Sequence, residues 1–178
     1  MPYSSLAEIQ AYMDDKLHET AWSQASAEDR RRAQIQAQKI IDRLRYKGYK
    51  NTVYLAFDAD PDLLLEYQQG CATALATVRT AEAAQTDEFP RGADTTVPSD
   101  IKVAENEITY ALLDGVDPDL ELENLAINNM GIGNVRASFI RSQEPHEHLI
   151  NGVPSSVAWR YLKPYLRDDD QLRLVRVS

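Results

Sequence analysis

Apolar residues recur at helical spacing through most of this chain, and capping residues stand at the ends of several such stretches. The first predicted helix covers residues 5–18, because Ser5 and Glu8 form a capping box ahead of the apolar stripe. Residues 20–25 are predicted to form a loop whose Trp22 fills the core. The stripe of the first helix consists of Leu6, Ile9, Met13 and Leu17.

The same signals predict four further helices, over residues 26–48, 60–84, 99–115 and 155–164. The start of the second of these, Asp60-Pro61, is an N-cap residue followed by proline at the first helical position. The residues expected to face the core are Ala33, Ala37, Ile40, Ile41 and Leu44; then Leu64, Tyr67, Cys71, Leu75 and Val78; then Ile101, Ala104, Ile108, Ala111 and Leu112; and last Val157, Ala158, Tyr161 and Leu162.

Other stretches alternate between apolar and polar residues. Residues 51–59 are expected to be irregular or a short strand, and residues 135–140 to be a strand. For residues 117–127 the pattern leaves a short helix and an extended segment open. The predicted fold class is therefore mainly α: a small helical bundle with a short β element near 133–141 and an extended C-terminal tail.

The 178-residue length predicts one domain over residues 1–166, followed by a tail at 167–178. We expect no membrane span, because no stretch approaches the 18 or more apolar residues that a membrane helix needs. No secretory signal is visible at the N-terminus. The single cysteine, Cys71, excludes an intramolecular disulfide framework and fits a reducing compartment. It falls on a predicted apolar face and is expected to be a buried, inert thiol.

The net charge of −9 argues against a nucleic-acid-binding role, which usually depends on Lys and Arg at the phosphates. The charges are unevenly spread: residues 82–123 hold twelve acids against two bases, and residues 28–47 hold seven bases against three acids. Either these are two solvated helix faces, or the bases contact an acidic neighbouring subunit. On the second interpretation the candidate subunit–subunit residues are Arg30, Arg31, Arg32, Lys39 and Arg43.

We find no pattern that indicates catalysis, a cofactor or a metal. His146 and His148 are two residues apart and lack further ligands for a closed zinc shell. Residues 131–133 lack the third glycine of a dinucleotide site. The acids at 168–170 are adjacent and do not converge like a calcium loop. Glu105 and Glu107 stand two apart on a predicted helix and should point to different faces.

A series of fragments in fixed order resembles the head–tail connector, or adaptor, family of tailed bacteriophages, the helical ring protein below the portal. The similarity covers residues 3–47 and 88–166, whereas residues 52–86 depart from the pattern and look like an insertion with its own helix. The fragments are the opening at 3–17, Ala21-Trp22, the capped second helix, Phe89-Pro90-Arg91, Val97-Pro98, the helix to Gly115, Gly133-Asn134-Val135, and Leu162-Lys163-Pro164-Tyr165-Leu166.

The resemblance implies a structural virion protein of the neck that assembles as a ring, typically of twelve subunits. Its partners would be the portal protein above, a tail, terminator or nozzle protein below, and other copies of itself. Double-stranded DNA would only pass through the lumen. Acids from residues 82–123 would line the lumen wall and repel the DNA phosphates, so that the DNA does not bind there. The C-terminal tail would contact the portal through Leu172, Arg173, Leu174, Val175, Arg176 and Val177.

Two alternatives belong to other classes. Some relatives of this sequence type are described as single-stranded-DNA-binding or primosomal-like proteins, a role that needs a basic groove with stacking aromatics. Tyr46, Lys47, Tyr49 and Lys50 offer a small version of such a groove. A cytoplasmic helical scaffold with a protein partner is the other alternative.

Overall fold

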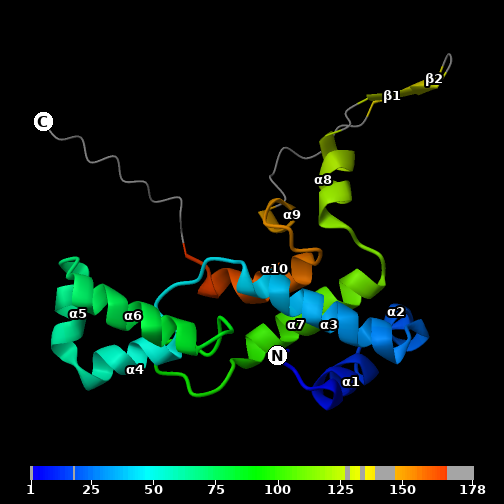
Figure 1. Ribbon diagram of the computed structural model, residues 1–178. Helices are drawn as coiled ribbons and strands as arrows, with labels where there is room; N and C mark the ends of the chain where they lie inside the picture. The colour runs from blue at the N-terminus through cyan, green and yellow to red at the C-terminus, as the bar shows by residue number, and fades with distance from the viewer. Residues whose placement is uncertain (1, 18, 127–128, 133–134, 139–146, 168–178) are drawn as a thin grey trace, which may run out of the picture. The chain divides into compact units, whose positions relative to one another are not determined.

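The computed structural model of the protein describes residues 2–17, 19–126, 129–132, 135–138 and 147–167 (Figure 1). Over these residues the fold is mainly α, as the sequence predicts. The chain divides into two compact units, each built from two separate segments. The first comprises Met1–Asp42 and Ser99–Tyr161, and the second comprises Arg43–Pro98 and Leu162–Ser178.

In the first unit the long helix α7 (Ser99–Leu113) packs along α3 (Ala27–Asp42), and the two lie side by side in Figure 1. The expected apolar face of α7 is confirmed, since Ile101, Ala104 and Ile108 are fully buried and Ala111 is nearly so. As predicted, α7 stops at Gly115, where φ is +83° and a glycine avoids the strain of the left-handed region.

Helices α1 (Leu6–Asp14) and α2 (Thr20–Gln24) complete one side of this unit. The predicted capping box is present: Glu8 N–H donates to Ser5 Oγ over 3.2 Å, and Ser5 N–H to Glu8 Oε2 over 2.7 Å. Trp22 is buried in a cluster with Ile9 and Met13, as predicted, but residues 20–24 are helical and not a loop.

The remaining elements of the first unit are α8 (Pro118–Ala126), the strands β1 (Asn129–Ile132) and β2 (Val135–Ser138), α9 (Glu147–Ile150) and α10 (Ser156–Leu162). The two strands pair antiparallel, with Met130 opposite Ala137. Parts of the β element expected near 133–141, namely residues 133–134 and 139–141, lie outside the described residues. In α10, Ala158 and Leu162 are fully buried as predicted, whereas Val157 and Tyr161 are 40% and 38% exposed and were wrongly expected to face inward.

The second unit holds a small bundle of α4 (Asn51–Ala59), α5 (Pro61–Gln68) and α6 (Ala72–Ala84), with the 3-10 helix η1 (Lys163–Tyr165) after α10. The expectation of an irregular segment or strand at 51–59 is wrong. Val53 and Phe57 are four residues apart and both enter the core, while Leu55 is 52% exposed. The apolar spacing of i and i+4 is helical, and burial of these two side chains against α5 and α6 decides between the patterns.

The single helix expected over residues 60–84 is two helices. Asp60 is the predicted N-cap, accepting the Asp62 N–H over 3.2 Å, but the helix ends at Gln68. Gly70 follows with a φ of +77°, a left-handed conformation that breaks the helical run. Helix α3 likewise ends at Asp42, before the expected stop at Gly48. Residues 51–84 therefore form three helices with a common core.

We predict that Phe57→Ala lowers the free energy of unfolding of the second unit by about 3 kcal/mol, because the ring leaves a cavity among Val53, Leu63 and Val78. Leu55→Ala on the same helix should change it by less than about 0.5 kcal/mol. Chemical denaturation followed by far-UV circular dichroism measures both. An equal loss in the two variants would contradict the helical arrangement, since a strand would place both side chains on one face.

Candidate interaction surfaces

Four of the five basic residues predicted for subunit contact lie on α3, and Arg43 directly follows its last residue. Arg30 is used within the first unit: its guanidinium lies 4.8 Å above the Trp22 ring, and Nε donates to Trp22 O over 2.9 Å. Its Nη2 also donates to Ser23 O over 3.2 Å. Arg30 therefore fastens α2 to α3, a role that the run of three arginines did not reveal.

Arg32 forms ion pairs with Glu28 and Asp29 on the exposed first turn of its own helix. Arg31 and Lys39 are exposed and have no ion-pair partner among the described residues. They are eight residues apart, so they lie within about 80° of each other around α3. Arg43 is exposed as well, but it interacts with other groups of the chain. The structure thus leaves Arg31 and Lys39 as the cations that α3 offers outward.

The acids of residues 82–123 do not form one surface. Glu88 is in an ion-pair network of the second unit, and Glu105 and Glu107 are buried in the first. The exposed members of the first unit gather after α7 and on α8, where none has a cationic partner among the described residues: Asp114, Asp117, Asp119, Glu121 and Glu123. Leu120 and Leu122 of α8 are 55% and 39% exposed beside these acids.

The buried carboxylates of α7 are the main feature that sequence reasoning missed. Glu105 is fully buried, and its two oxygens accept the backbone N–H groups of Tyr3 over 2.9 Å and Ser4 over 2.6 Å. Burial raises the pKa of Glu105 to about 7, against the lowering effect of these hydrogen bonds. Its position four residues after Ile101 and three before Ile108 places it on the apolar stripe, a signal that was available in the sequence.

Glu107 points to a different neighbour from Glu105, as their two-residue spacing predicts. It accepts hydrogen bonds from the Tyr12 hydroxyl and the Lys16 ammonium of the α1 region. The Lys16 Nζ lies 4.6 Å from the centroid of the Tyr110 ring. Burial and the Glu107 carboxylate raise the pKa of the Tyr12 phenol. Donors from the same chain bind both carboxylates, so these two side chains dock the N-terminal region on α7.

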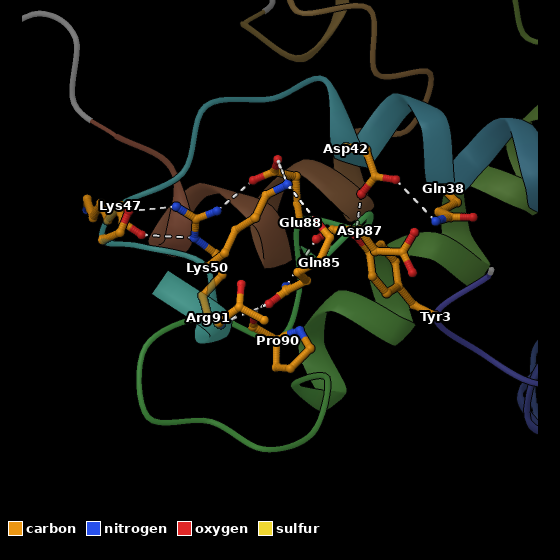
Figure 2. Close-up of polar contacts among 12 residues, drawn as sticks. Tyr3, Gln38, Asp42, Lys47, Lys50, Gln85, Asp87, Glu88, Pro90 and Arg91 are labelled. Atoms are coloured by element: carbon orange, nitrogen blue, oxygen red, sulfur yellow. Dashed lines mark hydrogen bonds and ion pairs between the residues drawn. The ribbon is translucent and has the colours of Figure 1, made fainter. Parts of the chain in front are cut away.

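In the second unit an ion-pair network joins residues 47–50 to residues 85–91, as Figure 2 shows. Glu88 accepts from Lys50 Nζ over 3.2 Å and from Arg91 Nη1 over 2.6 Å. Arg91 also donates to the carbonyl oxygens of Lys47 and Gly48, and Lys50 to that of Gln85. The side chains of Lys50 and Arg91 are only 12% and 14% exposed, so these charges are largely withdrawn from water.

The two tyrosines of the group at 46–50, considered above for binding single-stranded DNA, pack against other aromatic rings of the second unit. Tyr46 is buried and makes an edge contact with Phe89 at 4.7 Å between ring centroids. Phe89 makes a further edge contact with Tyr165 at 5.9 Å. Tyr49 is 39% exposed and packs edge-on against Phe57. Of the small basic and aromatic group at 46–50, only Lys47 and Tyr49 are therefore well exposed.

Cys71 is not the buried thiol that the sequence predicts. It is the N-cap residue of α6 and is partly exposed, and it packs against the edge of the core that α4, α5 and α6 share. A hydrogen bond with the Thr73 hydroxyl, at 3.0 Å, and the backbone N–H groups of Thr73 and Ala74 lower the pKa of the Cys71 thiol.

Among the described residues, no group of three or more His, Cys, Asp or Glu side chains could hold a metal ion. His146 and the acids at 168–170 lie outside those residues. In the part of the chain that the structure describes, every helix is too short or too polar to cross a membrane.

The predicted portal-contact residues, Leu172–Val177, lie outside the described residues. The chain that leads to them is attached to the second unit: Leu166 forms a bridge with Tyr46, and Arg167 N–H donates to Arg45 O over 3.0 Å. Residues 166 and 167, which precede the predicted tail residues, are therefore held on this unit.

Comparisons with known proteins found no matching family model, no matching curated protein and no matching solved structure.

We predict that Glu88→Gln lowers the free energy of unfolding of the second unit by about 2 kcal/mol, since it leaves Lys50 and Arg91 near-buried without a counter-charge. The matched control is Glu82→Gln on the exposed side of α6, which should change it by less than about 0.5 kcal/mol. Urea denaturation of both variants measures the difference. If Glu88→Gln and the wild type have the same free energy of unfolding, the ion-pair network makes no net contribution to the stability of the second unit.

Proposed function

We propose that this protein is a structural component of a tailed-bacteriophage neck, a head-to-tail adaptor that forms a ring between portal and tail. The observation that carries the proposal is the ordered series of sequence fragments from residue 3 to 47 and from 88 to 166. The finer parts of the expected fold, the short β element near 133–141 and an extended C-terminal tail, belong to this proposal.

The places that the fragments occupy in the fold support it. Trp22 and Phe89 are buried, and Leu162 is fully buried. The fragment that ends at Gly115 is the C-terminal part of α7, the helix buried on most sides. The fragments therefore include core residues of both units, which a shared fold requires.

In the proposed assembly, neighbouring subunits meet through Arg31 and Lys39 of one copy and exposed acids of the next. The C-terminal tail contacts the portal, and a tail, terminator or nozzle protein binds on the other side. Double-stranded DNA passes through without being held, because carboxylates on a lumen wall repel phosphate. The protein acts in the virion neck, after assembly in the host cytoplasm, and carries out no catalysis.

The two alternatives predict other partners. Tyr46 and Lys50 do not support the single-stranded-DNA-binding interpretation, because Tyr46 is buried against Phe89 and Lys50 is paired with Glu88. A cytoplasmic helical scaffold fits the mainly α fold equally well, but leaves the ordered fragments unexplained. Binding to a portal protein separates the adaptor from both.

Mass photometry of the full chain, alone and mixed with the portal protein of its phage, tests the proposal directly. We expect a ring-sized species or co-migration with the portal, and we expect Arg31→Glu and Lys39→Glu to reduce assembly at least tenfold. The matched control is Arg79→Glu, the same charge change at an exposed position of α6. A monomer that ignores the portal would reject the adaptor, and a shift with single-stranded DNA at modest salt would favour the alternative.

Deletion of residues 168–178 should weaken co-assembly with the portal at least tenfold and leave the thermal unfolding midpoint unchanged. The reason is that the alternating apolar and basic residues Leu172–Val177 would add the contact area on the portal. As a control, a variant with Gly and Ser at residues 168–178 keeps the chain length but removes these side chains. It distinguishes the effect of losing the side chains from the effect of shortening the chain. Unchanged co-assembly by the truncated protein would refute the assignment of the tail.

A further inference from the structure

The N-terminal segment of residues 2–5 is held against α3 and α7 by polar contacts, and Glu105 is their centre. Tyr3 and Ser4 donate their backbone N–H groups to the two carboxylate oxygens. Gln34 of α3 donates to Ser4 O over 2.6 Å, and the Tyr3 hydroxyl donates to Asp42 at the end of α3. Tyr3 and Ser4 are 7% and 2% exposed, so the docked segment covers Glu105.

Glu105 has no cationic partner, although cations lie on neighbouring turns. Lys102 of α7 donates to Glu8 over 2.6 Å, and Lys16, beyond α1, pairs with Glu107. The charged group of α3 that acts on Glu105 is Asp42, which is itself negative. The ionised form of Glu105 is therefore favoured only by neutral donors, the backbone N–H groups of Tyr3 and Ser4 and the Ser4 side chain, against full burial and a like charge.

We propose that residues 2–5 form a latch whose docking is coupled to protonation of Glu105, so that the latch is closed in acid and loosens as the pH rises through neutrality. This inference concerns a device within the first unit and does not depend on the proposed function. The hinge is Ser5, the N-cap of α1. The rest of α1 stays in place through Ile9, Met13 and the contacts of Tyr12 and Lys16 with Glu107.

The direction follows from proton linkage. With the segment docked, the pKa of Glu105 is raised to about 7. With the segment lifted, water reaches the carboxylate and its pKa returns toward the ordinary value of 4.5. Between these two values the docked form holds one more proton than the lifted form, so docking weakens with each unit of rising pH. Below pH 4.5 docking is at its strongest, and above pH 7 the loss is complete.

Residue-resolved amide hydrogen exchange of Tyr3 and Ser4 by NMR, from pH 4.5 to pH 8, tests the latch. After correction for the intrinsic rate, we expect the opening equilibrium of these amides to rise on the order of a hundredfold, and to level off above pH 7. In Glu105→Gln the two amides should exchange with a pH-independent opening equilibrium, whatever its absolute level. An opening equilibrium that is flat with pH in the wild type, or equally steep in Glu105→Gln, would overturn the proposal.

The matched control is Glu8→Gln, which removes a carboxylate next to the same hinge. Hydrogen bonds from Lys102 and Ser5 lower the pKa of Glu8 to about 2, so its titration falls outside the tested range and the slope should stay as in the wild type. A second measurement needs no variant: the side-chain carboxyl carbon of Glu105, followed by NMR in the intact protein, should titrate near pH 7. A midpoint at or below 4.5 would overturn the latch even if Glu105→Gln failed to fold.

Discussion

The burial of α7 is the constraint on which the first unit depends. From Ile101 to Thr109, seven of the nine side chains are buried, and four of those are polar: Glu105, Asn106, Glu107 and Thr109. A buried polar group costs free energy unless it is hydrogen-bonded. The two carboxylates meet this condition by recruiting the N-terminal segment and α1, and Thr109 by donating to Glu105 O over 2.8 Å. Residues 3–16 are thus positioned by polar residues of a helix about a hundred positions later in the chain.

This arrangement gives two neighbouring carboxylates different physical roles. Glu107 shares its charge with Lys16 and Tyr12, so it remains a fixed link between α1 and α7. Glu105 has only neutral donors, so its protonation state follows the solvent exposure of the segment that covers it. A cationic partner therefore separates the permanent link at Glu107 from the pH-responsive link at Glu105. The two carboxylates meet different partners because they stand two residues apart on the same helix.

The second unit is stabilised by other means. Its helices α4, α5 and α6 share a small apolar core, and a cluster of half-buried charges around Glu88 joins the loops on either side of them. Aromatic rings at 46, 89 and 165 pack edge-on and bring the chain after α10 back to this unit. Of the two tyrosines that the sequence alone offers for stacking on nucleic acid, Tyr46 is consequently in the interior of the fold, whereas Tyr49 stays partly exposed.

Local sequence determined the elements whose signals are complete within one turn. The capping box of Ser5 and Glu8, the Asp60 N-cap and the stop at Gly115 depend only on neighbouring backbone groups, and all three were predicted correctly. The apolar stripe of α7 was equally clear, because its apolar residues recur at helical spacing, although the structure also buries polar residues beside them.

Tertiary structure decided what local patterns leave ambiguous. Residues 51–59 alternate like a strand and also carry apolar residues four apart, and only the presence of α5 and α6 as packing partners selects the helix. Arg30 belongs to a charged run in the sequence, yet the Trp22 ring and two carbonyl oxygens take it into the fold. Glu105 acquires its environment from Tyr3 and Ser4, about a hundred residues away. Contacts over such separations depend on the whole chain, so the sequence by itself determined the helices and their caps, and the packing of those helices decided which charges are held and which remain free.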